Sequence, residues 1–216
     1  MTLAARRGKT LEEICEEIAA SGGHATAVEM DVTDAVSVER AVAGIPGGVD
    51  ILVNNAGISL SAPALKISEA DWDRVTDTNL KGVFLVAQAA AKRMRDEGGG
   101  AIVNVASILG LRVAGSLASY AASKAGVVRL TEALALEWAR FGIRVNALCP
   151  GYIETDINRD FFGTEAGQAL MRRIPQRRLG HAGELDAPLL LLCSEAGSYI
   201  TGAALAVDGG HLVSSL

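Results

Sequence analysis

The chain has 216 residues, half of them hydrophobic and 21% charged, which provides enough apolar side chains for a folded core and excludes a mainly disordered chain. The net charge is −5, and no stretch is dense in lysine and arginine, which argues against a nucleic-acid partner. Cys15, Cys149 and Cys193 cannot all pair within one chain, and the three histidines lack metal-ligand spacing. We therefore expect reduced thiols and no metal site. Because no apolar stretch is long enough to cross a membrane, we also expect a cytoplasmic protein without a membrane partner.

Strand-like and helix-like segments alternate along the chain, which is typical of a parallel sheet covered by helices. After a strand at the amino end, further strands are predicted over residues 24–30, 50–53, 101–105, 144–148 and 203–207. Helices are predicted over residues 10–20, 35–43, 69–97 and 119–140, with another ending at 192. Thr10 and Glu13 have the spacing of a capping box for the first helix. Since no repeat or linker is visible, we expect one domain over residues 1–216.

Tyr120 and Lys124 form the strongest chemical pattern in the sequence. Four positions apart on a predicted helix, they share one face, with Cβ atoms about 5–6 Å apart. A neighbouring ammonium favours tyrosinate, and lowering a phenol pKa from about 10 to about 7 needs roughly 4 kcal/mol of such stabilisation. The pair could then donate a proton to a carbonyl or accept one from an alcohol. Taken alone the pattern is common, and an ordinary tyrosine and lysine on a helix surface are the alternative.

Small or polar residues follow three of the predicted strands. They are Asn54-Asn55-Ala56-Gly57 after 50–53, Ser107 after 101–105, and Pro150-Gly151 with Thr155 after 144–148. In open α/β sheets ligands bind at the carboxyl ends of the strands, so these residues are expected to meet at one edge. Each feature alone is equally consistent with a simple turn or a polar strand end. Together they predict a ligand site.

With these residues in place, the chain resembles the classical short-chain dehydrogenase/reductase family, and among its members the 3-oxoacyl-acyl-carrier-protein reductases. The resemblance extends from Leu3 to about Gly210. The matching motifs, in the order of the family, are Asp31-Val32, Asn54-Asn55-Ala56-Gly57, Asn79, Ser107, Tyr120-Ala121-Ala122-Ser123-Lys124, Pro150-Gly151 and Thr201-Gly202 with Asp208-Gly209-Gly210. The resemblance implies a Rossmann-like α/β fold, a doubly wound parallel sheet in a single domain.

The resemblance also implies the catalytic roles. Tyr120 is expected to be the general acid/base, Lys124 to lower its pKa and bind the nicotinamide ribose, and Ser107 to hold the substrate oxygen. Asn79, with Lys124, is expected to order a water that connects the site to solvent. Without the other three, a helix-interior amide satisfied by the backbone would explain Asn79 better. The implied activity is the interconversion of an alcohol and a ketone or aldehyde, with hydride passing between the substrate carbon and the nicotinamide of NAD(P)(H).

Contacts with the dinucleotide are implied by the same resemblance. Asp31 and Val32 would contact the adenine, and Asn54, Ala56 and Gly57 the adenosine ribose side. Ile153 and Thr155 would contact the carboxamide and phosphates. The other cofactor-binding residues are Tyr120, Lys124, Pro150 and Gly151. Members that use NAD usually carry an acid at the end of the second family strand, where this chain has Arg6 and Arg7. Because arginine can pair bidentately with a 2′-phosphate, the sequence favours NADP(H), with NAD(H) possible. The alternative is that both arginines are ordinary solvated charges.

The chain departs from the family at its amino end. The family begins with a strand, a glycine-rich turn T-G-x-x-x-G-x-G and a helix, and no such turn occurs in this sequence. This first β-α unit is therefore missing, and with it the amides that bind pyrophosphate. In the family order 3-2-1-4-5-6-7 the absent strand is the central one, so unpaired edges are expected on both sides of it. Either the true start lies upstream, or this is a truncated member whose sheet closes differently.

Substrate identity is expected to depend on residues 151–184, an irregular and partly helical excursion. Phe161, Phe162, Leu170 and Met171 would form an apolar lid over the site. Four arginines of this segment could favour an acidic or carrier-bound substrate. The alternative is that they are solvated charges on a mobile loop. They are Arg172, Arg173, Arg177 and Arg178. The resemblance implies a homodimer or homotetramer, with Leu134 and Trp138 on a contact helix. The alternative function is a non-catalytic, oligomer-forming or regulatory subunit that does not bind the dinucleotide.

Overall fold

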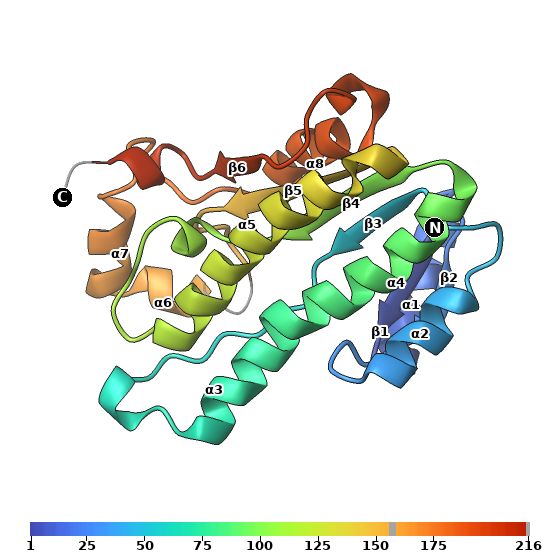
Figure 1. The fold of residues 1–216 in the computed structure, drawn as a ribbon. Helices are drawn as coiled ribbons and strands as arrows, with labels where there is room; N and C mark the ends of the chain where they lie inside the picture. Colours follow the sequence, from blue (N-terminus) through green and yellow to red (C-terminus); the bar gives the residue numbers. More distant parts are fainter. Residues whose placement is uncertain (156–158, 215–216) are drawn as a thin grey trace.

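A computed structural model describes residues 1–155 and 159–214, and its strands and helices alternate as the sequence predicts (Figure 1). The strands are β1 (Thr2–Ala5), β2 (Thr26–Glu29), β3 (Ile51–Asn54), β4 (Gly100–Val105), β5 (Ile143–Pro150) and β6 (Ala204–Val207). The helices are α1 (Gly8–Ala20), α2 (Ala35–Ala43), α3 (Glu69–Thr76), α4 (Gly82–Glu97), α5 (Ala118–Trp138), α6 (Arg159–Gly163), α7 (Glu165–Met171) and α8 (Asp186–Cys193).

The strands form two parallel sheets. The larger has the order β3-β4-β5-β6, with Ile102 of β4 opposite Val145 of β5, and the smaller consists of β1 and β2. Because every pairing is parallel, the carboxyl ends of β3 to β6 lie at one edge of the larger sheet. The segments that follow these strands therefore meet there, as the sequence predicts.

Helices cover both faces of the larger sheet because its central strands are apolar on both sides. Along β4, Ile102 packs into a core shared with α2, α4 and α5, whereas its neighbour Val103 packs with Leu148 and Leu192 on the opposite face. Ile102 and Val103 are both fully buried. Figure 1 shows α4 and α5 on one side of the strands and α8 on the other. The predicted α/β class with a doubly wound parallel sheet is confirmed.

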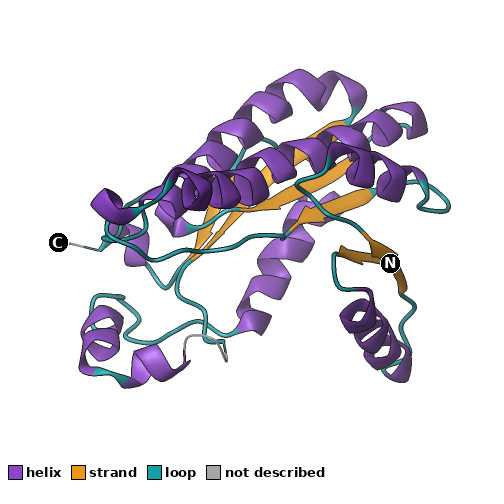
Figure 2. Cartoon of the chain, turned by 90° about the horizontal axis from the view of Figure 1, so that it is seen from below, coloured by secondary structure: helices purple, strands orange, loops and turns teal. Residues whose placement is uncertain are grey.

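The two sheets do not pair with each other: β1 and β3 each keep one free edge. Figure 2 shows β1 and β2 turned away from the larger sheet. The side chains of β3 reflect the break, since Ile51 is 52% and Val53 38% exposed, whereas the neighbouring strand β4 is almost completely buried. The unpaired edges of β1 and β3 agree with those expected from the sequence.

Two helix predictions differ from the structure. Helix α1 begins at Gly8, two residues before Thr10, and its preceding residue Arg7 makes no side-chain capping hydrogen bond, so the predicted capping box is wrong. The helix predicted over residues 69–97 is divided into α3 and α4 by a π-helical turn, Asp77–Lys81. Such turns cluster at functional sites, and this one contains Asn79.

The helix that was expected to contact a second copy points the predicted side chains inward. Leu134 is 4% exposed and belongs to the core, and Trp138 packs against the same core. These two side chains therefore pack within the subunit, because α5 turns its i, i+4 stripe toward the sheet. The expectation that α5 contacts a second copy stays a prediction. Leu136, between them, is 84% exposed.

Among the described residues, no helix combines the length and apolarity needed to cross a membrane. Within the same residues, no three His, Cys, Asp or Glu side chains are grouped as metal ligands would be.

Candidate active site

Three of the predicted catalytic side chains meet at the carboxyl end of β4. Ser107 follows this strand and is 8% exposed, and its Oγ accepts a hydrogen bond of 3.1 Å from the Leu109 N–H. Tyr120 lies in the first turn of α5, where the Ser107 hydroxyl also hydrogen-bonds the phenol. Lys124, one turn further, lies with its Nζ 5.8 Å from the centre of the Tyr120 ring. The ammonium donates a 2.7 Å hydrogen bond to the Val105 carbonyl and is thereby fixed against the sheet.

Burial pushes both members of the Tyr120–Lys124 pair toward their neutral forms. It raises the pKa of Tyr120 above its usual 10.0, although the hydrogen bond from Ser107 opposes the rise. It lowers the pKa of Lys124 from 10.5 to about 8. Removal of the phenol from water is the largest cause of the Tyr120 shift. The expectation that Lys124 lowers the Tyr120 pKa stays a prediction. Lys124 is the member of the pair that titrates nearest to neutral pH.

Asn79 ties the catalytic helix to the loop after β3. Its side chain is fully buried, and its Nδ2 donates to the Ile58 carbonyl at 2.8 Å and to Ser123 Oγ at 3.1 Å. Its Oδ1 accepts from the Ile58 N–H at 2.8 Å, and Ser123 Oγ donates to the Tyr120 carbonyl. Both amide hydrogens of Asn79 are therefore used by protein atoms, and Oδ1 keeps one free lone pair. The predicted role in ordering a water would have to use that lone pair.

Gly57, the last residue of the Asn-Asn-Ala-Gly motif, lies beside Asn79 and Lys124. A Cβ at this position would lie 3.4 Å from Asn79 Oδ1 and 3.5 Å from Lys124 Nζ. The missing side chain leaves room for a ligand group beside the ammonium. A ribose hydroxyl fits this place by its chemistry, since it accepts a hydrogen bond from an ammonium. The residues present therefore fit the nicotinamide-ribose end of a dinucleotide.

Asn54, from the same motif, points into the sheet. It is 7% exposed, and its Nδ2 donates to Asn104 Oδ1 at 2.9 Å and to the Val83 carbonyl at 3.3 Å. Asn104 in turn donates to Thr131 Oγ1 at 3.0 Å. This buried chain of hydrogen bonds joins β3, β4 and α5 and engages the amide nitrogen of Asn54, whereas its Oδ1 makes no hydrogen bond within the described residues. Sequence reasoning missed Asn104, although a lone amide inside an apolar strand was its visible signal.

The residues predicted to contact the adenine lie at the end of β2. The Asp31 carboxylate accepts hydrogen bonds from the Thr33 N–H at 2.9 Å and hydroxyl at 2.8 Å, which hold its pKa below the usual 3.8. The positive charge of Arg6, which follows β1, also lowers the Asp31 pKa, so the ends of β1 and β2 lie beside each other. Val32 packs against Gly82, where a Cβ would lie 2.9 Å from the valine side chain. A small cavity of about 10 Å³ is lined by Val32, Asn54, Ala56, Thr78, Gly82 and Val83.

The loop after β5 is held against β6 and against residue 180. Pro150 pairs with Val207, and a Cβ at Gly151 would lie 2.6 Å from the Asp208 side chain, so this close approach requires glycine. Ile153 forms a parallel bridge with Gly180, and Thr155 is exposed. Among the described residues, no glycine-rich strand-to-helix turn supplies N–H groups for the phosphates. The pyrophosphate is therefore the part of a dinucleotide that the described residues fit least.

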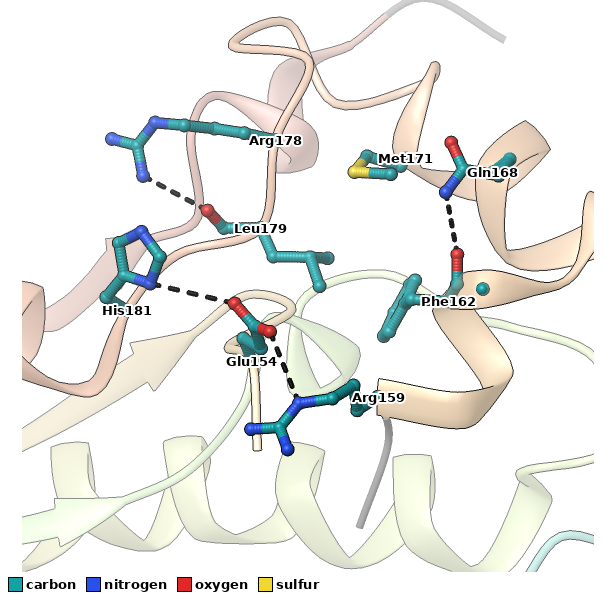
Figure 3. Close-up of a pocket in the computed structure, with 9 residues that line it drawn as sticks. Glu154, Arg159, Phe162, Gln168, Met171, Arg178, Leu179 and His181 are labelled. Carbon is teal, nitrogen blue, oxygen red and sulfur yellow. Dashed lines mark hydrogen bonds and ion pairs between the residues drawn. The ribbon is translucent and has the colours of Figure 1, made fainter. Parts of the chain in front are cut away.

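A cavity of about 370 Å³ lies between α6, α7 and the segment that leads to His181 (Figure 3). Its lining residues are Glu154, Arg159, Phe162, Gly163, Gln168, Met171, Arg178, Leu179 and His181. Of the four residues predicted to form an apolar lid, Phe162 and Met171 face this cavity, whereas Phe161 is 47% exposed. Arg178 is bound in two 2.7 Å hydrogen bonds by the Glu184 carboxylate.

Comparison with known proteins identifies the family of the chain. A family model described as enoyl-(acyl carrier protein) reductase matches residues 2–211. D-threitol dehydrogenase of Mycolicibacterium smegmatis is 39% identical over 205 residues, which are 94% of this chain and 79% of that protein. 2-Dehydro-3-deoxy-D-gluconate 5-dehydrogenase of Escherichia coli is 44% identical over 177 residues, 81% of this chain and 70% of that protein. These relatives are dehydrogenases, so the alternative of a non-catalytic subunit is not favoured.

A solved structure extends the similarity to the fold. Gluconate 5-dehydrogenase of Burkholderia cenocepacia, in complex with NADP and tartrate, superposes with a TM-score of 0.95 at 35% identity. The alignment covers 99% of this chain and 86% of that one. The match of sequence and fold leads to one conclusion. The chain belongs to the classical short-chain dehydrogenase/reductase family and is an NAD(P)-dependent oxidoreductase of alcohols and carbonyl compounds.

Proposed function

We propose that this chain interconverts a secondary alcohol and a ketone in a small polyhydroxylated compound, a polyol or a sugar acid, with NADP(H) as the preferred cofactor. The observation that carries the proposal is the meeting of Ser107, Tyr120 and Lys124 at the carboxyl end of β4. The substrate class is supported by the similarity to dehydrogenases of threitol, 2-dehydro-3-deoxygluconate and gluconate.

Tyr120 would handle the proton of the reacting oxygen. In the reductive direction its phenol donates a proton to the carbonyl oxygen, and in the oxidative direction its tyrosinate accepts one from the alcohol. Ser107 would stabilise the same oxygen by donating a hydrogen bond. The bound nicotinamide supplies the hydride chemistry. Because burial raises the pKa of Tyr120, oxidation is expected to speed up with rising pH and reduction to be faster near neutral pH.

Lys124 would bind the nicotinamide ribose through the space that Gly57 leaves open. With a pKa of about 8, its side chain is mostly an ammonium at pH 7. It can donate hydrogen bonds to ribose hydroxyls while it keeps its hydrogen bond to the Val105 carbonyl. Asn79 would act through position, because it fixes the loop after β3 to the helix that carries Tyr120.

The preference for NADP(H) rests on Arg6, which follows β1 and whose charge acts on Asp31 at the end of β2. A guanidinium at this place can pair with a 2′-phosphate, and Arg7 is a second exposed donor one residue on. Val32, Asn54 and Ala56, which line the same small cavity, would form the wall beside the adenosine. Ile153 and Thr155 would contact the carboxamide and phosphates. NAD(H) remains the second cofactor to test.

A dimer or tetramer is part of the proposal. Exposed apolar side chains lie on two helices of the described chain, Leu136 at 84% on α5 and Leu190 at 65% on α8. Single exposed apolar residues are normal, but helices that cover a sheet are natural contact surfaces between identical subunits. Sedimentation velocity of the purified chain would give the stoichiometry directly.

The proposal is tested by NADPH consumption with keto forms of sugar acids and polyols, and by NADPH fluorescence in their absence. We expect saturable binding and turnover, with kcat/KM for NADPH about tenfold to a hundredfold above that for NADH. Arg6→Gln should remove most of this ratio, while Arg95→Gln, which removes an exposed arginine in the last turn of α4, should leave it unchanged. Absence of both binding and turnover at high protein concentration would support a non-catalytic subunit instead.

A further inference from the structure

Three side chains that take no part in the proton transfer lie at the ends of three neighbouring strands. Arg112 follows β4 beyond Ser107, Tyr152 follows β5, and His211 follows β6. The rings of Tyr152 and His211 are 5.5 Å apart between centres. Arg112 Nη1 donates to the His211 carbonyl and, at 3.3 Å, to Ser214 Oγ. Arg112, Tyr152 and His211 are called the Arg–Tyr–His cluster below.

The cluster adjoins the acid/base residue. Tyr152 follows β5, the strand that pairs with β4, and Ser107 follows β4. The phenols of Tyr152 and Tyr120 also interact electrostatically, which raises the pKa of Tyr120. The positive charge of Arg112 acts on Tyr152 in turn and opposes the rise in its pKa caused by burial. A substrate whose reacting carbon lies at Tyr120 would therefore extend toward this cluster.

His211 has an unmet hydrogen-bonding group. Its side chain is 5% exposed, and its Nδ1 is buried without a hydrogen-bond partner in the described part of the chain. Buried polar atoms are nearly always paired, so an exception beside an active site points to a partner supplied by a ligand. A carboxylate oxygen beside the ring would be the acceptor that the fold itself does not provide.

The cluster also has donors and positive charge to offer. Within residues 1–155 and 159–214, Nε and Nη2 of Arg112 make no hydrogen bond, which leaves its planar fork available. Asp208, whose negative charge also acts on His211, is engaged by the backbone N–H groups of Gly210 at 2.9 Å and Leu212 at 2.5 Å. Arg173 adds a further positive charge near His211. The charges around the cluster therefore favour binding of an anion.

We propose that the Arg–Tyr–His cluster binds the carboxylate of a hydroxy-acid substrate, which narrows the function proposed above, on which it rests, from polyols to sugar acids. Arginine matches a carboxylate with two parallel N–H groups, and the Tyr152 hydroxyl and the His211 ring each add one donor. A neutral polyol would engage the same fork with single, uncharged hydrogen bonds and would bind less tightly.

The test uses acid and polyol pairs that differ only at the terminal carbon: D-gluconate with D-glucitol, and glycerate with glycerol. For each pair, kcat/KM for oxidation is measured with NADP, and binding without turnover is measured by calorimetry. The wild-type chain should favour at least one acid over its polyol by tenfold or more. Arg112→Gln and Tyr152→Phe should each reduce that ratio about tenfold and change the values for the polyol less than twofold.

Controls separate this subsite from folding and from the proposed function. Arg129→Gln removes an exposed arginine from the far part of α5 and should keep the ratio, and Tyr152→Phe keeps the ring contact with His211. Oxidation of acids and polyols with equal efficiency would overturn the carboxylate subsite and leave the proposed function standing. If the wild-type chain oxidises none of the four compounds but binds gluconate, and Arg112→Gln weakens that binding, the proposed function would be overturned and the carboxylate subsite supported.

Discussion

The buried ammonium of Lys124 is expected to destabilise the folded chain. Its folded-state pKa of about 8, against 10.5 for a free lysine, corresponds to about 3 kcal/mol of unfavourable burial at pH 7. Lys124→Met keeps the length of the side chain and removes the charge, but it also loses the hydrogen bond to the Val105 carbonyl, which contributes about 1 kcal/mol. The free energy of unfolding of the variant should therefore be about 2 kcal/mol higher than that of the wild type at pH 7.

The sign of the pH dependence follows from the same shift. The folded chain releases the Lys124 proton near pH 8, whereas the unfolded chain holds it to about 10.5, so the unfolded state binds more protons between these values. The stability of the wild type should rise with pH in that window relative to the variant. The free-energy difference between the two should thus shrink from about 2 kcal/mol at pH 7 to about zero near pH 9.5.

Urea unfolding monitored by circular dichroism at several pH values measures this difference. The control is Lys9→Met, which removes an exposed lysine of α1 and should follow the wild-type curve throughout. A difference between Lys124→Met and wild type that stays constant from pH 7 to 9.5 would show that burial does not shift this amine, and the reasoning would be wrong.

Two further predictions concern packing around the site. Asn104→Ala leaves Asn54 Nδ2 and Thr131 Oγ1 without their buried partner, so the unfolding free energy measured in urea should fall by about 2–4 kcal/mol; a loss below 0.5 kcal/mol would show that water replaces the amide. Gly110→Ala places a Cβ 2.7 Å from the Lys124 carbonyl, so α5 must shift and kcat should fall at least tenfold; an unchanged kcat would contradict the close packing described here.

The catalytic centre could be predicted from sequence because its parts are local patterns. Tyr120 and Lys124 are one helical turn apart, and Ser107 directly follows an apolar strand, so periodicity alone places them at one edge of the sheet. The pKa directions could not be predicted in this way. Burial of the Tyr120 phenol depends on α5, β4 and the loop after β5 together, and no short pattern contains that information.

The Arg–Tyr–His cluster was also invisible in the sequence. Its members are 40 and 59 positions apart and carry no spacing rule, and only the pairing of β5 with β6 brings Tyr152 beside His211. The π-helical turn that contains Asn79 was missed for a related reason. The apolar pattern continues through it from α3 to α4, while its Asn79 is held by two hydrogen bonds with Ile58, 21 residues earlier.

Tyr120→Phe tests the central assignment most directly. Single-turnover reduction of a ketone substrate is followed by the loss of NADPH absorbance, and NADPH binding is followed separately by fluorescence. The account predicts a rate reduced by a factor of about 10²–10⁴ with cofactor affinity changed less than threefold, because the phenol donates the proton and Lys124 remains in place. A variant that reduces the ketone at close to the wild-type rate would contradict Tyr120 as the general acid/base.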